Sequence, residues 1–300
     1  MILIISKNDE ITTDEVIKWL LAMGKKFIRV NEDEVFEIKV NHKRIYIESH
    51  RNSFFSDEIT SVWYRRGGLK FKQLSYKNPA IQMHMRETQH WLEEYVLKTL
   101  EAKKHINKQS NSHVNKLVVL EKAIQAGLDV PNYFLADSTA DVVLNETIVK
   151  PITGTPILNS LDGKANVMMY TTVVEEPEEQ DFFISFFQKK VEKDFEIRSF
   201  YLNGKTSSIA IISQNDEQTK TDYRKYNIQK PNRNVRYNLP KEVEDKINLL
   251  MLSLDLNCGS LDFIKSGDKF YFLEVNTIGQ FLGLAEACNF SFDKEIADYL

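Results

Sequence analysis

The chain has 300 residues, of which 42% are hydrophobic and 27% charged, and its formal net charge is −4. This length accommodates one large domain or two to three small ones, and the composition is typical of an ordinary globular protein. The net negative charge argues against a nucleic-acid partner. No apolar run approaches the ~20 residues that span a bilayer, and the N-terminus lacks the charged start of a signal peptide, so we expect no membrane partner and a cytoplasmic location.

The first third of the chain predicts a small α/β domain. The expected elements, in chain order, are a strand (2–6), a helix (11–23), a strand (27–30), a hairpin (35–49), a strand (61–64) and a long amphipathic helix (about 79–105). A strand, a helix and a strand within thirty residues are typical of an α/β unit. The polar segment 103–112 has no apolar period, so we place a domain boundary there and assign residues 1–112 to the first domain.

The rest of the chain predicts mostly strands. The expected elements are a helix (about 113–126), strands (142–150, 167–172, 184–191, 196–202 and 206–213), a helix (about 240–255) and two antiparallel strands (259–266 and 269–276). A glycine-containing loop at 151–166 and a polar segment at 214–239 separate some of these elements. The two cysteines, Cys258 and Cys288, lie in apolar stretches outside any metal-ligand spacing, so we expect buried core thiols and no disulfide or zinc.

Acidic and amide side chains interrupt the last hairpin. Glu274 and Asn276 share a face by strand alternation, and Asp262 can lie opposite them on the paired strand. Carboxylates on otherwise buried strands are costly unless a cation neutralises them. Mg²⁺ prefers a few such oxygens and completes its shell with phosphate and water. The pattern therefore favours a magnesium site, while a half-exposed hairpin with a polar face is the alternative.

The chain carries cationic side chains but no common nucleotide-binding motif. Neither a Walker A sequence nor a GxGxxG turn is present. Lys150 ends an apolar strand before the glycine-containing loop, where it can reach a phosphate, although an edge-strand lysine that extends to solvent fits as well. Glu196 and Arg198 point to one face of a later strand. Arg224, in a polar loop, could bind a phosphoryl group bidentately, or it could simply be solvated.

The order of these elements over roughly residues 113–300 resembles the ATP-grasp fold. The similarity is greatest to the branch that contains the ribosomal-protein glutamate ligases and the peptide-macrocyclising graspetide synthetases. The resemblance implies an α/β (α+β) fold class with a pre-ATP-grasp domain at 1–112, a central subdomain at 113–185 and a C-terminal subdomain at 186–300. It also implies ATP and Mg²⁺ as cofactors.

Carried over to this sequence, the resemblance implies a role for each motif residue. The expected roles are ATP phosphate contacts for Lys116 and Lys150, backbone hydrogen bonds to adenine at the hinge Gln188, Lys189 and Val191, ribose binding for Glu196, contacts to phosphates and acyl-phosphate for Arg198 and Arg224 with Asn227 nearby, and Mg²⁺ binding for Asp262, Glu274 and Asn276. Residues 153–166 of the glycine-containing loop would serve as a lid over the site. Glu196 stands where these ligases usually have aspartate, and the phosphate loop has fewer glycines than in the glutamate ligases.

The run from Trp63 to Arg66 and the run from Glu274 to Phe281 resemble the graspetide synthetases of the grasp-with-spasm type. That resemblance implies a ribosomally made precursor peptide, with a leader and an acidic, Thr-rich core, as the partner. Asp or Glu side chains would be linked to Ser, Thr or Lys side chains, and a homo-oligomer is expected. Arg65 and Arg66 are the candidates for gripping an acidic peptide, with an ion pair to Asp or Glu as the alternative.

Two other functions stay open at this point. A ligase of the same fold could add an amino acid to a peptide or protein tail, which would increase the mass of its substrate. A non-catalytic nucleotide- or peptide-binding module would form no ADP. The sequence names no general base and does not distinguish ester from amide links.

Overall fold

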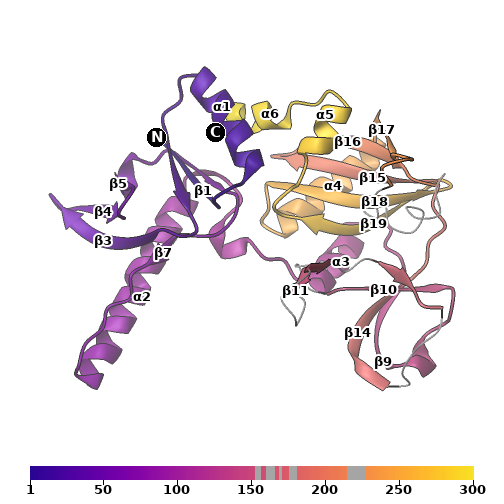
Figure 1. The fold of residues 1–300 in the computed structure, drawn as a ribbon, viewed down its shortest axis with the longest axis horizontal. Coiled ribbons are helices and arrows are strands. Elements are labelled where there is room, and N and C mark those ends of the chain that lie inside the picture. Colours follow the sequence, from indigo (N-terminus) through magenta and orange to yellow (C-terminus); the bar gives the residue numbers. More distant parts are fainter. Residues whose placement is uncertain (153–156, 160–165, 169–170, 176–180, 215–226) are drawn as a thin grey trace. The chain divides into compact units, whose positions relative to one another are not determined.

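The structure is a computed structural model that describes residues 1–152, 157–159, 166–168, 171–175, 181–214 and 227–300. Two compact units are present (Figure 1). The first unit contains Met1–Ser112, Leu256–Cys258 and Phe290–Leu300, and the second contains His113–Asp255 and Gly259–Asn289. The last turns of the chain therefore belong to the first unit.

The first unit combines two small sheets with three helices. Its elements are β1 (Ile2–Ser6), α1 (Ile11–Ala22), β2 (Phe27–Asn31), β3 (Val35–Asn41), β4 (Arg44–Glu48), β5 (Ser53–Phe55), β6 (Ser61–Tyr64), β7 (Lys70–Phe71), α2 (Pro79–Glu101), β8 (Lys104–Ile106) and α6 (Phe292–Tyr299). One sheet has the order β2-β1-β6-β8, with every pair parallel, and the other has the order β5-β4-β3-β7. All five residues of β1 are buried, as expected of a central strand in a parallel sheet.

The end of α2 differs from the sequence prediction. Asn78 caps the helix by accepting hydrogen bonds from two backbone N–H groups of its first turn, and Pro79 occupies the first helical position. The predicted helix ran to about residue 105, whereas α2 ends at Glu101. Residues 104–106 instead form β8 and extend the parallel sheet beside β6. A tertiary strand pairing thus overrides the local helical pattern.

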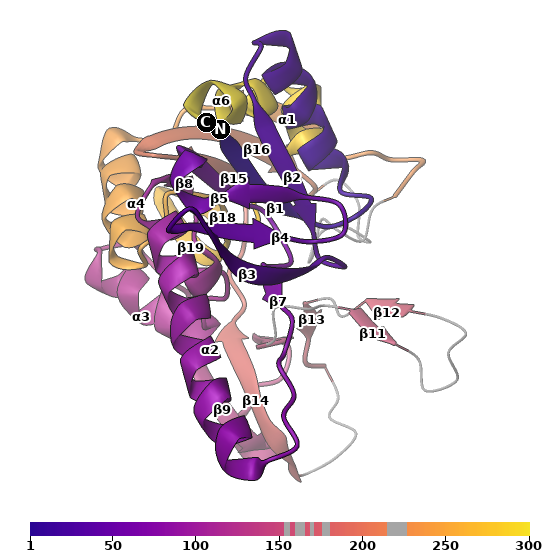
Figure 2. The ribbon, with the colours of Figure 1, turned by 90° about the vertical axis from the view of Figure 1, so that its left-hand side faces the viewer.

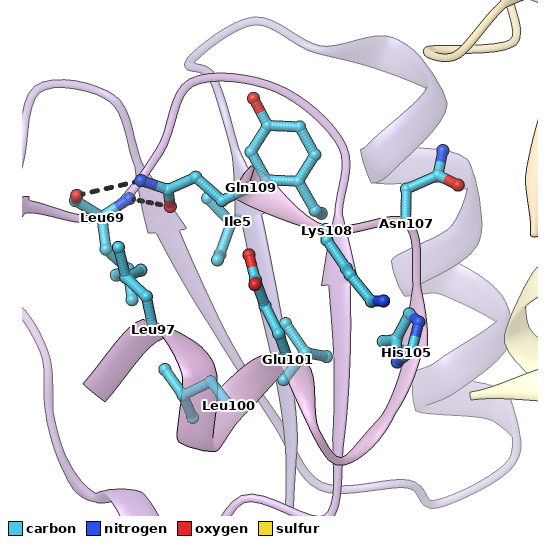
Figure 3. A pocket seen from close by; sticks show the side chains of 11 residues that line it. Ile5, Leu69, Leu97, Leu100, Glu101, His105, Asn107, Lys108 and Gln109 are labelled. Atoms are coloured by element: carbon cyan, nitrogen blue, oxygen red, sulfur yellow. Dashed lines mark hydrogen bonds between the residues drawn. The ribbon is translucent and has the colours of Figure 1, made fainter. Parts of the chain in front are cut away.

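A small hollow lies between this sheet and the last turns of α2 (Figure 3). The side chain of Gln109 closes it by accepting a hydrogen bond from the backbone N–H of Leu69 at 2.8 Å and donating to its carbonyl at 3.4 Å. The hollow measures about 10 Å³, which is about the space of one water molecule. It is too small for a nucleotide, so the first unit offers no ATP pocket at this place.

The C-terminal residues are anchored within the first unit. Trp19 of α1 donates to Asp293 of α6 at 2.8 Å, and Lys25 donates to the carbonyl of Ala297 at 2.7 Å. The hydroxyl of Ser61 donates to the carbonyl of the last residue, Leu300. Because α6 has only eight residues, tertiary packing rather than a long sequence period holds it, and the sequence reading did not predict it.

The described residues of the second unit form a four-stranded sheet, a five-stranded sheet, a two-stranded hairpin and three α-helices. Its elements are α3 (Lys116–Gln125), β9 (Tyr133–Ser138), β10 (Thr147–Lys150), β11 (Ile157–Asn159), β12 (Asn166–Met168), β13 (Thr172–Val173), β14 (Asp181–Lys189), β15 (Phe195–Leu202), β16 (Lys205–Ile212), β17 (Arg233–Tyr237), α4 (Lys241–Ser253), β18 (Cys258–Ser266), β19 (Lys269–Asn276) and α5 (Leu282–Ala287). One sheet has the order β13-β10-β14-β9, another has the order β17-β16-β15-β18-β19, and β11 and β12 form a short hairpin. Figure 2 shows the long β14 beside β9.

The strand that contains the proposed hinge starts three residues earlier and ends two residues earlier than the predicted strand 184–191. β14 ends at Lys189, so a subdomain boundary at residue 185 would fall inside it. A boundary after β14 is the division that we now propose for this unit. Both cysteines are free and buried, and burial raises the pKa of the Cys258 thiol to about 12, so this thiol stays protonated and unreactive. Among the described residues, no helix has both the length and the apolar character needed to cross a membrane.

Candidate active site

The final hairpin brings the three predicted metal ligands onto neighbouring positions. Asp262 of β18 lies directly opposite Glu274 of β19, and Ser260 lies opposite Asn276. A register shift follows Asp262, where the ladder is locally irregular. Opposed residues on antiparallel strands have Cβ atoms about 4.5–5.5 Å apart, so the two carboxylates repel each other unless cations lie between or beside them.

Arg198 supplies one of these cations. Its Nε and one terminal nitrogen each donate to an Asp262 carboxylate oxygen at 2.8 Å, and both side chains are largely buried. Such a bidentate pair fixes both groups in orientation as well as in charge. Arg198 therefore lies on the face of the sheet that carries the acids, and its predicted contact to phosphates stays a prediction.

Lys116 supplies the second cation. It is the first residue of α3, whose N-cap is Asn115, and its ammonium group lies 3.2 Å from a Glu274 oxygen. The same group donates to the carbonyl of Pro151 at 3.1 Å. Because Pro151 directly follows Lys150, this bond ties the end of β10 to the acidic hairpin. Lys116, Lys150 and the acids therefore belong to one local constellation.

Asn276 is held in a defined orientation at the end of β19. Its side-chain oxygen accepts a hydrogen bond from the backbone N–H of Ile278 at 3.1 Å. An amide oxygen has two lone pairs, so one remains for a cation. The turn continues through Gly279, whose φ of 58° is in the left-handed region that favours glycine, and whose N–H donates to the carbonyl of Asn276.

The donor set fits magnesium. Two carboxylates and one amide oxygen on adjacent strands are hard ligands, and Mg²⁺ usually completes such a set with phosphate oxygens and water. Across the described ranges, no cluster of three or more His, Cys, Asp or Glu side chains could hold a metal ion by itself. Since each acid is paired with Arg198 or Lys116, a cation would have to share the acids with them or displace them.

Gln188 is the most informative residue of the other sheet. It lies within β14, opposite Ile148 of β10 and Tyr133 of β9, so its backbone faces neighbouring strands on both sides. Its side chain is completely buried, and neither its amide oxygen nor its amide nitrogen has a hydrogen-bond partner. An unpaired buried amide costs roughly 1–3 kcal/mol, so such a group is expected to meet a ligand. The backbone contact to adenine stays the prediction for Gln188, and its buried side-chain amide is a second group that could bind the base once the site opens.

Lys150 shares a face of this sheet with Gln188. Lys150 of β10 lies opposite Phe186 of β14. Phe186 is two residues before Gln188, so strand alternation places the side chains of Lys150, Phe186 and Gln188 on one side of the sheet. The opposite side carries Phe187, which packs in a core with Ala136 and Val142. The sheet is thus apolar on one face, while the other face carries a lysine and an unpaired amide. Both are groups that can bind a nucleotide.

The other residues predicted to bind adenine or ribose are Lys189, Val191 and Glu196, and two of them contact neighbouring residues of this chain. The backbone N–H of Lys189 donates to the carbonyl of Asn132 at 2.7 Å, and Val191 is half-buried after the strand ends. Glu196 pairs closely with Lys193, and both side chains are nearly buried. The sequence reading missed Lys193, although its i,i+3 spacing to an acid was visible. A ribose hydroxyl at Glu196 would join an existing ion pair.

Two predicted features lie mostly outside the described residues. One is Arg224, and the other is the loop at 153–166 that was expected to act as a lid. Asn227 is described and half-buried, and its side-chain oxygen accepts from the backbone N–H of Gln229 at 3.0 Å. The roles predicted for Arg224 and Asn227 remain proposals.

Arg65, in the first unit, forms the ion pair that the sequence left open as the alternative to peptide binding. It is only 3% exposed, and its guanidinium makes two hydrogen bonds to Glu10 at 3.2 and 3.0 Å. Burial alone would raise the pKa of Glu10, but the hydrogen bonds and charge of Arg65 outweigh it and hold that pKa below its ordinary value. Arg65 is therefore paired with Glu10 and nearly inaccessible to solvent, and its peptide-binding role stays a prediction. The neighbouring Arg66 is half-buried, its Nε has no hydrogen-bond partner, and it keeps the peptide role as a proposal.

Replacing Arg65 by alanine is expected to lower the free energy of unfolding by about 3–5 kcal/mol at pH 7, because Glu10 would be left charged in a partly buried site. The matched change Arg66→Ala is expected to cost less than about 1 kcal/mol. Since the pKa of Glu10 is lowered in the folded state, the pair stabilises above the ordinary value of 4.5 and loses this effect as the pH falls through the lowered value. Urea unfolding at pH 7 and pH 4 would measure both effects, and equal costs for the two variants would contradict the assignment.

Comparison with known proteins finds one family model that matches the N-terminal part of the chain. Residues 1–113 match the family model described as the MvdD pre-ATP grasp domain. No curated protein matches the chain.

Solved structures extend the similarity over the whole chain. Macrocyclase MdnC from Microcystis aeruginosa MRC, solved with precursor peptide MdnA, is 23% identical, with 100% of this chain and 99% of that chain covered and a TM-score of 0.75. A RiPP-associated ATP-grasp ligase from Chryseobacterium gregarium, in complex with ADP and a leader and core peptide, is 24% identical, with 99% and 94% covered and a TM-score of 0.78. Macrocyclase MdnB from Microcystis aeruginosa MRC is 22% identical, with 100% and 98% covered and a TM-score of 0.73.

These similarities establish the class of fold. The chain has an ATP-grasp fold preceded by a pre-ATP-grasp domain, which confirms the predicted α/β (α+β) fold class.

Proposed function

We propose that the chain is an ATP-dependent carboxylate ligase that links side chains within a ribosomally made precursor peptide. Asp or Glu side chains would be joined to Ser, Thr or Lys side chains as macrocyclic esters or amides. The observation that carries this proposal is the array of Arg198, Asp262, Glu274 and Lys116 at the end of the lysine-bearing strand. Support comes from solved proteins of the same fold that hold ADP and peptides.

The proposed reaction requires that the negative charge on a phosphoryl group be stabilised. A carboxylate is a poor electrophile, and transfer of the γ-phosphoryl group of ATP to one of its oxygens gives an acyl-phosphate and ADP. A hydroxyl or amine of the same peptide then attacks the acyl carbon, the bond to phosphate breaks, and the proton of the nucleophile leaves. Positive groups that stabilise the phosphoryl oxygens are the main catalytic requirement.

The residues of this chain would divide these tasks. Lys116 and Lys150 would orient the ATP phosphates. Arg198 would stabilise the negative charge on the transferring phosphoryl group once Asp262 binds a metal cation in place of Arg198. Asp262, Glu274 and Asn276 would hold Mg²⁺, which when bound neutralises phosphate charge. The Gln188 amide would read the base, because its oxygen can accept from the adenine amino group and its nitrogen can donate to a ring nitrogen.

The peptide and its surroundings are also part of the proposal. The Arg66 guanidinium would attract acidic residues of the peptide, since it has unused donors and Arg65 is already neutralised by Glu10. The expected cytoplasmic location agrees with two free, buried cysteines.

Co-expression with candidate precursor peptides that carry a leader and an acidic, Thr-rich core, followed by intact-mass analysis of each peptide, tests the function. Macrocyclisation is expected to remove one water per link, and each link should consume one ATP. A peptide that gains the mass of an amino acid would instead identify a ligase that extends a peptide tail. If none of the candidate peptides leads to ADP formation and every peptide keeps its mass, the chain is a binding module and the proposal is wrong.

A further inference from the structure

Ser260 lies on the face of the final hairpin that carries the proposed metal ligands. It stands on β18, two residues before Asp262 and opposite Asn276 of β19, while Asp262 lies opposite Glu274. Side chains two residues apart on a strand share a face, and opposed residues of an antiparallel pair point to the same side. The two opposed pairs therefore adjoin on one face of the sheet, where Figure 1 shows β18 beside β19.

The hydroxyl of Ser260 is buried without a partner. The residue is 0% exposed, and among the described residues its side-chain oxygen has no hydrogen-bond partner. By contrast, the equally buried Ser199 of β15 shares a hydrogen bond of 2.8 Å with the hydroxyl of Ser208. A hydroxyl bonds to water in the unfolded chain, so burial without a partner is unfavourable. We therefore expect the hydroxyl of Ser260 to have a partner in another state of the protein.

Aromatic rings lie beside Ser260 in the same sheet. β15 is the neighbour of β18 and runs antiparallel to it, and Arg198 of β15 bonds Asp262 of β18. Two residues after Arg198, Phe200 therefore comes beside Ser260. Phe200 is 3% exposed and packs edge-on against Phe281, with the ring centroids 4.9 Å apart. These rings exclude water from this end of the face.

The turn after β19 packs directly on Ser260. A Cβ atom at Gly279 would lie 3.6 Å from the hydroxyl oxygen of Ser260 and 3.6 Å from its backbone nitrogen. The backbone of the turn thus covers the hydroxyl at van der Waals distance. The side-chain amide of Asn276 is a polar group within its reach, because opposed residues have Cβ atoms about 4.5–5.5 Å apart.

The amide of Asn276 can offer Ser260 a hydrogen bond. Its oxygen accepts from the backbone N–H of Ile278, and its nitrogen donates no hydrogen bond to the part of the chain that the structure describes. A serine hydroxyl can accept as well as donate, so it can take an N–H of this amide. The nitrogen and oxygen of an amide lie on one planar carbon. Anchoring the nitrogen therefore fixes the direction of the oxygen, which is the proposed metal ligand.

We propose that Ser260 is a positioning residue of the cation site, whose hydroxyl accepts a hydrogen bond from the amide nitrogen of Asn276 and so holds the amide oxygen toward Mg²⁺. This inference rests on the proposed function, because that function supplies the cation. Removing a group that orients a metal ligand typically weakens metal binding by about 10–100-fold. Ser260 acts through Asn276 and touches neither ATP nor the peptide.

Mn²⁺ binding to the full chain in the presence of ADP tests the inference without catalytic turnover. Mn²⁺ takes the oxygen ligands that suit Mg²⁺, and electron paramagnetic resonance measures the free ion. Ser260→Ala is expected to raise the Mn²⁺ dissociation constant roughly tenfold or more. The urea midpoint without metal should stay at or above that of the wild type, because alanine removes a buried polar atom that has no partner. An unchanged dissociation constant would overturn the inference.

Ser199→Ala is the matched control. Ser199 is as buried as Ser260, and strand alternation places it on the face of β15 opposite to Arg198. Its removal leaves the hydroxyl of Ser208 unpaired, so the urea midpoint is expected to fall while the Mn²⁺ dissociation constant stays unchanged. A purely structural serine gives this pattern, so the same pattern in Ser260→Ala would contradict the positioning role.

A double variant distinguishes action through Asn276 from direct contact with the metal. In an Asn276→Ala background, Ser260→Ala is expected to raise the Mn²⁺ dissociation constant by less than about twofold, since the amide that it positions is gone. The full tenfold loss in that background would show that the hydroxyl binds the metal itself, and the positioning role would be wrong.

Asp262→Asn separates a failure of this inference from a failure of the proposed function. If Asp262→Asn weakens Mn²⁺ binding and Ser260→Ala does not, the cation site stands and only the role of Ser260 is wrong. If Asp262→Asn binds Mn²⁺ as tightly as the wild type, the hairpin holds no cation. Both the proposed metal site and the role of Ser260 would then be rejected.

Discussion

Glu274→Gln is expected to reduce peptide-dependent ADP release by about 10²–10³-fold or more while the protein stays folded. Glu274 lies opposite Asp262 and beside Lys116, so its carboxylate is central to the proposed cation site. The amide keeps the shape of the side chain and removes its charge. Because Glu274 and Lys116 are both partly exposed, their ion pair is worth less than about 1 kcal/mol, and the free energy of unfolding should hardly change.

The matched control is Asp268→Asn in the turn of the same hairpin. Asp268 is exposed between β18 and β19 and lies outside the site, so this change removes one negative charge without touching a proposed ligand. ADP release with the precursor peptide, measured by a coupled assay at saturating Mg²⁺, should be unchanged in this control. Near wild-type activity in Glu274→Gln would show that the metal assignment is wrong.

Gln188→Leu is expected to change stability and ATP affinity in opposite directions. In the nucleotide-free protein, leucine removes two buried polar atoms that have no partners, so the free energy of unfolding should rise by about 1–3 kcal/mol. ATP should bind about 10–100-fold more weakly, since the base loses its hydrogen bonds to the amide. Urea unfolding without nucleotide and isothermal titration calorimetry with ATP would measure the two effects.

Phe187→Leu provides the comparison for this prediction. Phe187 is adjacent in the chain but packs into the apolar core on the other face of the sheet. Its truncation should lower stability through a cavity and leave the ATP dissociation constant unchanged. If Gln188→Leu behaved like this control, the amide would be a structural group and the adenine proposal would fail.

The acidic hairpin shows what local pattern can determine. Its two strands, its turn at Gly267 and the opposition of Asp262 to Glu274 all follow from alternation and turn chemistry, and the structure has them at the predicted places. Strand alternation has a fixed period of two, so one correct register places every side chain on its face. The resemblance to ATP-grasp ligases likewise came from the order of such elements, and the fold confirms it.

The partners of the site residues depended on contacts between distant segments. Lys116 and Glu274 are 158 residues apart, and Arg198 and Asp262 are 64 apart, so no local period could pair them. Two further features have the same origin. Residues 104–106 form the strand β8 because they pair with β6, and Arg65 is a buried ion-pair residue because Glu10 lies beside it.

The sequence by itself thus determined the fold class and the faces on which the charged residues of β10, β15, β18 and β19 stand, because local periods and turn residues decide these. Tertiary structure alone decided which charges neutralise one another and that the amide of Gln188 is buried without a partner. Desolvation and ion pairing act through space, and the energy of a buried group depends on neighbours that the chain brings together only when it folds.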